Sequence, residues 1–294
     1  MRLLLLGANG QVGHELRRAL APLGAVVCTT RSGALDDGAP CEAADLDDPA
    51  SLPPLVARLA PDVVVNAAAY TAVDKAESDR EAAFRANADA PGELARACAA
   101  RDALLVHYST DYVFDGSATR PYREDDPTSP LGAYGESKLA GEQAVKDSGA
   151  RHMIFRTAWV YADRGRNFML TMLRLVGERD DLRVVDDQVG TPTPASLIAD
   201  GTAAMLRKPR QGSGLWHLTA RGGTTWHGFA EAIVERAHAL GRIPRRPRVI
   251  PIATADYPTP ARRPAWSRLD CSRFERDAGV RLPDWRDALE AVLR

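Results

Sequence analysis

The chain has 294 residues, of which 45% are hydrophobic and 26% charged, and its formal net charge is −1. This composition is typical of a soluble globular protein, and the charge gives no reason to expect nucleic acid or an anionic membrane as a partner. The longest apolar runs, such as LLLL at 3–6, are far shorter than a transmembrane helix. With no signal-peptide pattern and no C-x-x-C pair, we expect a reduced, cytoplasmic protein without a disulfide framework or a metal site.

Short apolar runs alternate with longer helical patterns in the first half of the chain. The strand candidates are MRLLLLG, GAVVCTT, PDVVVNAAA, ALLVHYST and HMIFRTAWVY, and helical segments such as 11–24 and 79–102 separate them. Strands that are buried on both faces and joined by helices form parallel sheets. The pattern therefore predicts an α/β fold with a Rossmann-type, doubly wound parallel sheet.

The alternation weakens from about residue 162 onward, although LRVVDD at 182 and GLWHLTA at 214 are still strand candidates. Prolines and arginines accumulate in GRIPRRPRVIP, which indicates a solvated connector because it lacks interleaved aromatic residues. The chain ends in the helix-like WRDALEAVLR. We expect a dinucleotide-binding domain at 1–161, to which some later strands return, and a smaller, interleaved substrate-binding domain at 162–294.

A glycine-rich turn follows the first strand candidate directly. Gly7, Gly10 and Gly13 lie at three-residue intervals across a strand-to-helix turn, with Gln11 and Val12 at the start of the helix. Glycines let the backbone approach a pyrophosphate, whose charge meets the free N–H groups of the helix. A plain tight turn is the alternative, but the position at the start of a βαβ unit favours dinucleotide binding. The spacing resembles that of the short-chain dehydrogenase/reductase superfamily.

The second strand ends in Thr29-Thr30-Arg31-Ser32, where a protein that prefers NAD usually has an acid to hold the ribose 2′-hydroxyl. Arg31 suits a 2′-phosphate instead. We therefore favour NADPH, although NADH is left open and Arg31 also fits a solvated loop.

Two further segments match cofactor contacts. Asp45 and Leu46 resemble the adenine-contacting pair of the superfamily, although the region also suits the start of a helix. Small residues follow the third strand candidate, where the carboxyl ends of parallel strands bind ligands. They either let the cofactor lie against the backbone or pack a core, and they are Ala67, Ala68 and Ala69, followed by Tyr70.

Tyr134 and Lys138 lie four residues apart on one expected helix. Residues at this spacing are neighbours on a helix surface. A nearby ammonium stabilises phenolate, so we expect the pKa of Tyr134 to fall from its reference value of ~10. The alternative without a catalytic role is a surface tyrosine whose ring is covered by the aliphatic part of the lysine side chain. Thr110 ends the fourth strand candidate at the same sheet edge. Carbonyl reduction needs a proton donor and a hydrogen bond that steers the oxygen, and these side chains supply both.

Thr110, Tyr134 and Lys138 resemble the catalytic pattern of the extended short-chain dehydrogenase/reductases. The resemblance implies that Tyr134 donates the proton, Lys138 holds the nicotinamide ribose and lowers the tyrosine pKa, and Thr110 orients the carbonyl. Asn87, in FRANADAPGEL, matches the helix asparagine of the same family, or is a polar residue on an exposed helix face.

Seven ordered segments resemble the dTDP-4-dehydrorhamnose reductase family: GANGQVG, NAAAYTAVDKAE, STDYVFDG, SPLGAYGESKLAGE, RTAWVY, DDQVGTPT and RRPAWSRLD. The family implies NAD(P)H-dependent reduction of the C4 ketone of dTDP-4-dehydro-6-deoxy-L-mannose to dTDP-L-rhamnose, a precursor of cell-surface polysaccharide. By the same resemblance Trp159 and Asn167 contact the sugar, unless Trp159 is core and Asn167 caps a helix. Arg262 and Arg263 are candidates for the substrate diphosphate, because an arginine fork fits phosphate oxygens.

Several readings stay open at this point. A homodimer and a divalent cation such as Mg²⁺ are compatible with the resemblance, but no ligand cluster is identifiable, and Glu15 fits a first-turn helix acid. Another nucleotide-sugar reductase or an epimerase is an alternative, as is a non-catalytic regulatory subunit like that of methionine adenosyltransferase. A 4,6-dehydratase of this fold uses an Asp-Glu pair after its threonine, whereas this chain has Asp111 and then Tyr112, so Asp111 suits a turn.

Overall fold

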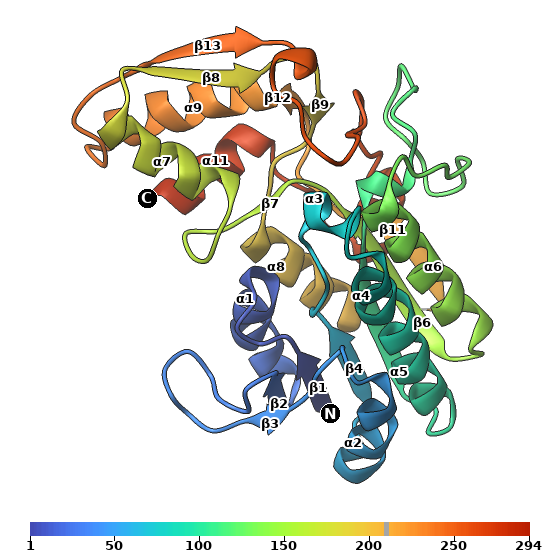
Figure 1. Ribbon diagram of the computed structural model, residues 1–294. Coiled ribbons are helices and arrows are strands. Elements are labelled where there is room, and N and C mark those ends of the chain that lie inside the picture. The colour runs from blue at the N-terminus through green and yellow to red at the C-terminus, as the bar shows by residue number, and fades with distance from the viewer. Residues whose placement is uncertain (209–211) are drawn as a thin grey trace.

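The structure is a computed structural model that describes residues 1–208 and 212–294 (Figure 1). In the first half, strands and helices alternate: β1 (Arg2–Leu6), α1 (Gln11–Leu20), β2 (Ala25–Thr30), β3 (Glu42–Ala43), α2 (Leu52–Leu59), β4 (Val63–Asn66), α3 (Val73–Ala76), α4 (Arg80–Phe84), α5 (Ala90–Ala99), β5 (Leu104–Thr110), α6 (Ala133–Asp147) and β6 (Arg151–Thr157). The second half contains β7 (Val160–Tyr161), α7 (Phe168–Glu178), β8 (Asp181–Val185), β9 (Val189–Gly190), β10 (Thr193–Pro194), α8 (Ala195–Leu206), β11 (Gly214–His217), β12 (Thr224–Thr225), α9 (Trp226–Ala239), β13 (Arg248–Ile252), α10 (Ser272–Ala278) and α11 (Trp285–Leu293).

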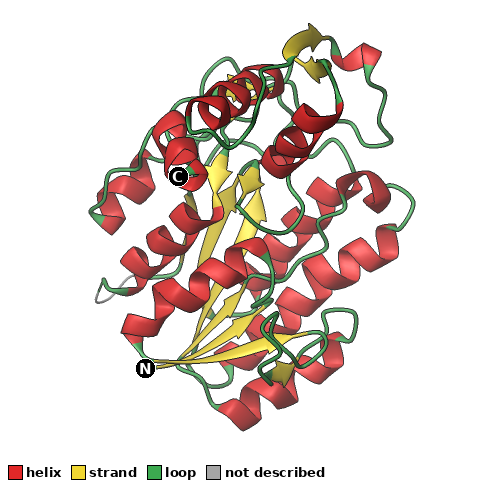
Figure 2. Cartoon of the chain, turned by 90° about the vertical axis from the view of Figure 1, so that its left-hand side faces the viewer, coloured by secondary structure: helices red, strands yellow, loops and turns green. Residues whose placement is uncertain are grey.

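Seven strands form one parallel sheet in the order β11-β6-β5-β4-β1-β2-β3. Helices cover both of its faces (Figure 2), which confirms the predicted doubly wound α/β fold. The strand order reverses direction at β1, whose neighbours are β2 and β4. The carboxyl ends of β1 and β4 therefore flank the crevice where such sheets bind ligands.

The first strand explains why both faces are covered. Its residues alternate between two cores, because successive strand side chains point to opposite faces. Leu3 and Leu5 pack with helices α1, α8 and α10, whereas Leu4 and Leu6 pack with α2, α5 and α6. All four leucines are at most 1% exposed. Truncation of any of them to alanine removes about 2–5 kcal/mol of stability.

A third core joins elements of the second half. It packs α7, α9 and α11 against β8, around large side chains such as Tyr161, Phe229 and Trp285. Strand β11 instead pairs with β6 and extends the large sheet. A later strand thus returns to the first sheet, while the domain boundary at residue 161 stays a prediction.

Two sequence expectations need correction. HMIFRTAWVY is not one strand, because Trp159 adopts a left-handed φ of +46° that breaks it into β6 and β7. The segment GRIPRRPRVIP is not only a connector, because Arg248–Ile252 forms β13 in parallel pairing with β8. The prolines in this segment argue against a strand in a large sheet. An edge strand can contain proline, however, and β13 is one of the two strands in its sheet. The terminal helix was expected correctly and is α11.

Candidate active site

The glycine-rich turn lies against the residues that follow β4. Gly7 has φ +77°, and a Cβ added there would lie 2.8 Å from the Ala68 nitrogen. A Cβ on Gly13 would lie 2.0 Å from the Gly7 carbonyl oxygen. Neither position admits a side chain, so the turn stays tight and the crevice beside it stays open. Ala67 and Ala68, predicted from the sequence to line this edge, are brought to it.

Helix α1 begins at this turn with an open N-terminus. Its cap residue Gly10 offers no side-chain acceptor, and the first turn contains no acid. The N–H groups of Gln11, Val12 and Gly13 have no hydrogen-bond acceptor among the described residues. Free donors and the positive end of the helix dipole suit a pyrophosphate. The residues present therefore fit a dinucleotide.

Arg31 follows β2 and extends toward two carboxylates. Its guanidinium lies 3.3 Å from Asp45 Oδ1 and 3.6 Å from Asp47 Oδ2, and its side chain is 74% exposed. Leu46 is buried between these acids. The structure thus brings together Arg31, Asp45 and Leu46, the three residues predicted for the adenosine end of the cofactor. The positive charge of Arg31 is partly neutralised by the two neighbouring carboxylates.

The catalytic candidates meet at the carboxyl edge of β5. Thr110 ends that strand, and its hydroxyl lies near the phenol of Tyr134 in the first turn of α6 while it donates to Asp111 Oδ1 at 3.0 Å. Lys138 follows one turn later and is only 2% exposed. The ring of Tyr112 meets that of Tyr134 edge-on, with centroids 5.8 Å apart. The alternative of a surface pair is excluded, because Lys138 is buried and Tyr134 is partly buried.

The pKa values of the pair differ from the sequence expectation. Burial raises the pKa of Tyr134 to about 12, against the lowering effect of the nearby Thr110 hydroxyl. The predicted fall is therefore wrong for this structure, because desolvation of phenolate dominates. Burial also lowers the pKa of Lys138 to about 8, while the carboxylate of Glu142 raises it. At neutral pH both groups carry their protons.

Asn87 is buried rather than exposed, so its surface alternative is excluded. It lies in a π-helical turn, Arg85–Asp89, that joins α4 to α5. Its amide accepts a hydrogen bond from the Tyr70 N–H and donates to the Tyr70 carbonyl, at 2.9 and 3.0 Å. It also donates to Ser137 Oγ on α6 at 3.0 Å. Asn87 therefore ties the Ala67–Tyr70 edge to the helix that carries Tyr134.

Asp111, which the sequence suggested as a turn-forming residue, is a buried acid next to Thr110 and is a further candidate for the site. Its carboxyl is 2% exposed and accepts a hydrogen bond from Thr110 Oγ1 at 3.0 Å. Burial raises its pKa to about 6. A buried acid directly after the catalytic threonine could have been noticed from its position at the strand end.

Trp159 lies beyond β6 and faces the second half of the chain. Its ring stacks on Trp226 of α9 with centroids 3.5 Å apart and planes 4° apart. A Cβ on Gly190 would lie 2.3 Å from this ring, so glycine leaves room for it. The left-handed φ costs ~1–3 kcal/mol, a strain typical of functional sites. Trp159 is half-buried, so it is not a simple core residue.

Asn167 caps α7, as the alternative reading expected. Its Oδ1 accepts from the Leu170 N–H at 3.0 Å, and its Nδ2 donates to Gln11 Oε1 and to the Ala162 carbonyl, both at 2.8 Å. The amide thereby links the first residue of α1 to the second half of the chain. A sugar contact by Asn167 stays a prediction, and these partners compete with it.

The two arginines near the C-terminus differ. Arg263 donates to both oxygens of Asp74, at 3.0 and 2.8 Å, so its fork is engaged. Arg262 is exposed and lines a small cavity with Tyr112, Tyr134 and Pro264. The cavity opens beside the catalytic phenol. Of the two, Arg262 is the better placed to meet a substrate phosphate.

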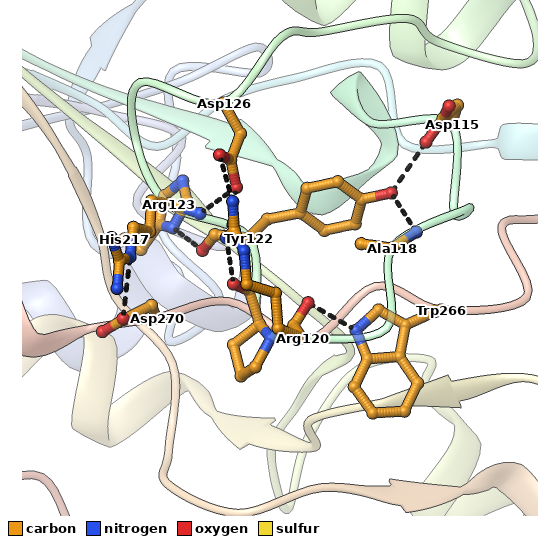
Figure 3. Close-up of polar contacts among 10 residues, drawn as sticks. Asp115, Ala118, Arg120, Tyr122, Arg123, Asp126, His217, Trp266 and Asp270 are labelled. Atoms are coloured by element: carbon orange, nitrogen blue, oxygen red, sulfur yellow. Dashed lines mark hydrogen bonds and ion pairs between the residues drawn. The ribbon is translucent and has the colours of Figure 1, made fainter.

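The segment between Thr110 and Tyr134 is fastened to the C-terminal segment (Figure 3). Tyr122 donates its hydroxyl to Asp115 at 2.7 Å, and its carbonyl accepts from His217 Nδ1 at 3.1 Å. The indole of Trp266 donates to the Arg120 carbonyl at 3.0 Å. These contacts join the segment that lies between Thr110 and Tyr134 in the chain to β11 and to the region of Trp266.

Comparisons with known proteins agree with this geometry. A family model described as RmlD substrate binding domain matches residues 1–294. A dTDP-4-dehydrorhamnose reductase from Burkholderia thailandensis is 50% identical over 303 residues, which cover 100% of this chain and 98% of the relative. The chain belongs to the dTDP-4-dehydrorhamnose reductase family.

Solved structures of the dTDP-4-dehydrorhamnose reductase family have the same fold. One from Clostridium acetobutylicum superposes with a TM-score of 0.90 at 35% identity, covering 100% of this chain and 98% of that one. Another, from Bacillus anthracis in complex with NADP, has a TM-score of 0.89 at 31% identity and covers 99% and 98%.

Two absences hold for residues 1–208 and 212–294. No group of three or more His, Cys, Asp or Glu side chains there is arranged to hold a metal ion. No helix in the same ranges has the length and apolar content needed to cross a bilayer.

Proposed function

We propose that this protein reduces the C4 ketone of dTDP-4-dehydro-6-deoxy-L-mannose with NADPH to give dTDP-L-rhamnose. The observation that carries the proposal is that buried Thr110, buried Lys138 and partly buried Tyr134 lie at the ligand edge of the sheet. Full-length similarity to proteins named dTDP-4-dehydrorhamnose reductase supports the choice of substrate.

The protein's residues have separate tasks in this proposal. Tyr134 is protonated at neutral pH because burial raises its pKa to about 12, so its phenol donates a proton to the oxygen of the developing alcohol. Thr110 hydrogen-bonds the same oxygen and fixes its direction. Lys138 stabilises the phenolate that remains, because its ammonium lies one helical turn away.

The nicotinamide cofactor supplies the hydride when it is bound. Gly7, Gly10 and the first N–H groups of α1 would hold its pyrophosphate. Ala67 to Tyr70 would lie beside it at the end of β4, with Asn87 keeping that edge in place. Arg31 would meet the 2′-phosphate of NADPH, while Asp45 and Leu46 contact the adenine. The NADP complex of the Bacillus anthracis relative supports this assignment.

The substrate occupies the side of the crevice that the second half of the chain closes. We assign the sugar contact to Trp159, because a strained backbone holds its half-buried ring, which stacks on Trp226. Arg262 takes the diphosphate from the cavity beside Tyr134. Asn167 can contact the sugar only if it breaks its hydrogen bond with Gln11, and Arg263 can contact the diphosphate only if it leaves Asp74.

Three coarser expectations accompany the proposal. We expect the protein to work in the cytoplasm, and the family resemblance is compatible with a homodimer and with an associated divalent cation such as Mg²⁺, for which no ligands are identified among the described residues. Size-exclusion chromatography with light scattering, with and without a chelator, tests the last two together.

A mixture of purified protein, NADPH and dTDP-4-dehydro-6-deoxy-L-mannose tests the function. We expect loss of reduced nicotinamide in step with formation of dTDP-L-rhamnose. Cofactor binding without turnover would instead favour the non-catalytic regulatory role. The catalytically dead control is the Tyr134→Phe variant, whose ring fills the same space.

A further inference from the structure

Glu142 lies on α6 one turn beyond Lys138 and is 0% exposed. Tyr134, Lys138 and Glu142 therefore follow one another at four-residue spacing along one face of the helix. Catalysis as proposed above gives no task to this third residue. A carboxylate so deeply buried is costly unless it has partners.

Arg156, on β6, is that partner. Its Nε and Nη2 donate to the two oxygens of Glu142, each at 2.8 Å, and its side chain is 3% exposed. Lys146, one turn further along α6, lies 3.5 Å from Glu142 Oε2 and reaches solvent. The paired geometry keeps Glu142 ionised, because Arg156 offsets the raising effect of burial and holds the pKa of this carboxyl below its usual value.

The charges around Lys138 are few. Glu142 acts on it from its own helix, and His107 lies near it on β5. Burial and the nearby ammonium lower the pKa of His107 far below its usual range, so the imidazole is neutral. Glu142 is thus the carboxylate among the described residues that acts on the Lys138 ammonium. Without it, Lys138 would be a buried cation with no carboxylate acting on it among the described residues.

We propose that Glu142, locked by Arg156, is a positioning residue: its carboxylate is the buried counter-charge for the Lys138 ammonium, one turn away on the same helix. The inference rests on the proposed function for its catalytic meaning, since Lys138 stabilises the phenolate only while it is charged. The charge relation itself can be measured without any substrate.

The sequence makes that measurement simple, because it contains four lysines, at 75, 138, 146 and 208. Lysine labelled with ¹³C at Cε gives one signal for each, and Lys138→Met assigns the one of interest. In Glu142→Gln we expect the titration midpoint of Lys138 to fall by about one pH unit or more, a tenfold loss of proton affinity. The high-pH limb of turnover should move by the same amount.

Glu136→Gln is the matched control, because Glu136 lies on the same helix but pairs with Arg80 at the surface. It should leave the Lys138 midpoint in place. If Glu142→Gln does not fold, Glu142→Gln with Arg156→Met removes the whole buried pair and should give the same displacement. An unchanged midpoint in whichever of these variants folds overturns the proposal. Failure of the ketosugar assay with a displaced midpoint would remove only the proposed function.

Discussion

Asn167 donates a hydrogen bond to Gln11 Oε1 at 2.8 Å and so joins the cap of α7 to the first residue of the glycine-rich helix. Asn167→Ala removes both this bond and the cap, and we expect it to cost about 1 kcal/mol, or ~2–4 °C in Tm. Asn167→Asp keeps an acceptor for the Leu170 N–H but loses the donor to Gln11 and to the Ala162 carbonyl. This variant should keep the cap, lose some stability because a carboxylate oxygen then faces that carbonyl, and bind NADPH more weakly; unchanged NADPH affinity would show that the link has no role in the cofactor site.

Tyr134→Phe removes the proton donor but keeps the ring against Tyr112. Turnover should fall by at least the ~10²-fold that a positioned acid contributes, while NADPH affinity stays near that of the unmodified protein. Steady-state kinetics and fluorescence titration of NADPH separate the two effects. Near-normal turnover in this variant would mean that another group donates the proton.

Arg31→Ala tests the assignment of the 2′-phosphate. A charged hydrogen bond contributes ~1.5–3 kcal/mol, and exposure together with the competing Asp45 and Asp47 should reduce the measured loss for NADPH. NADH affinity should barely change. Asp47→Asn is the matched control and should strengthen NADPH binding by freeing Arg31. Equal losses for both cofactors in Arg31→Ala would remove the assignment.

His217 makes stability depend on pH. Burial, helped by the charge of Arg156, lowers its pKa from 6.5 to about 3. Between these values the unfolded chain binds more protons than the folded one, so this contribution to stability rises with pH from about 3 to 6.5 and is lost on acidification.

His217→Asn keeps a donor for the Tyr122 carbonyl but cannot titrate. Urea denaturation at several pH values should show the unmodified protein losing up to about 1.4 kcal/mol more per pH unit than the variant below pH 6.5. Parallel curves for the two proteins would mean that His217 takes up a proton as readily in the folded protein as in the unfolded chain.

The strands, the glycine-rich turn and the Tyr134–Lys138 pair could be predicted from the sequence because each is a local pattern. The engaged fork of Arg263 could not, since its partner Asp74 lies 189 residues away. The pKa of Tyr134 was misjudged for the same reason: its burial depends on distant segments, whereas the nearby lysine is visible in the sequence. The positive φ of Trp159 could not be predicted from the sequence, because glycine is the residue that usually indicates a left-handed backbone.

The absence of a second carboxylate beside Thr110 separates reduction from dehydration. Tyr112 stands where a dehydratase needs a base, and burial raises its pKa well above the usual range for tyrosine. The protein incubated with dTDP-glucose and NAD should therefore give no 4-keto-6-deoxy product. Formation of that product without net change in cofactor would assign the dehydratase activity instead.

The destination of the hydride tests the central claim most directly. NADPH that carries deuterium at the transferable position of the nicotinamide is mixed with the protein and dTDP-4-dehydro-6-deoxy-L-mannose, and the product is examined by NMR. We predict dTDP-L-rhamnose with a single deuterium at C4 of the sugar and an equal amount of oxidised cofactor. A product without deuterium at C4, or deuterium at any other carbon, would contradict the reduction proposed for this site.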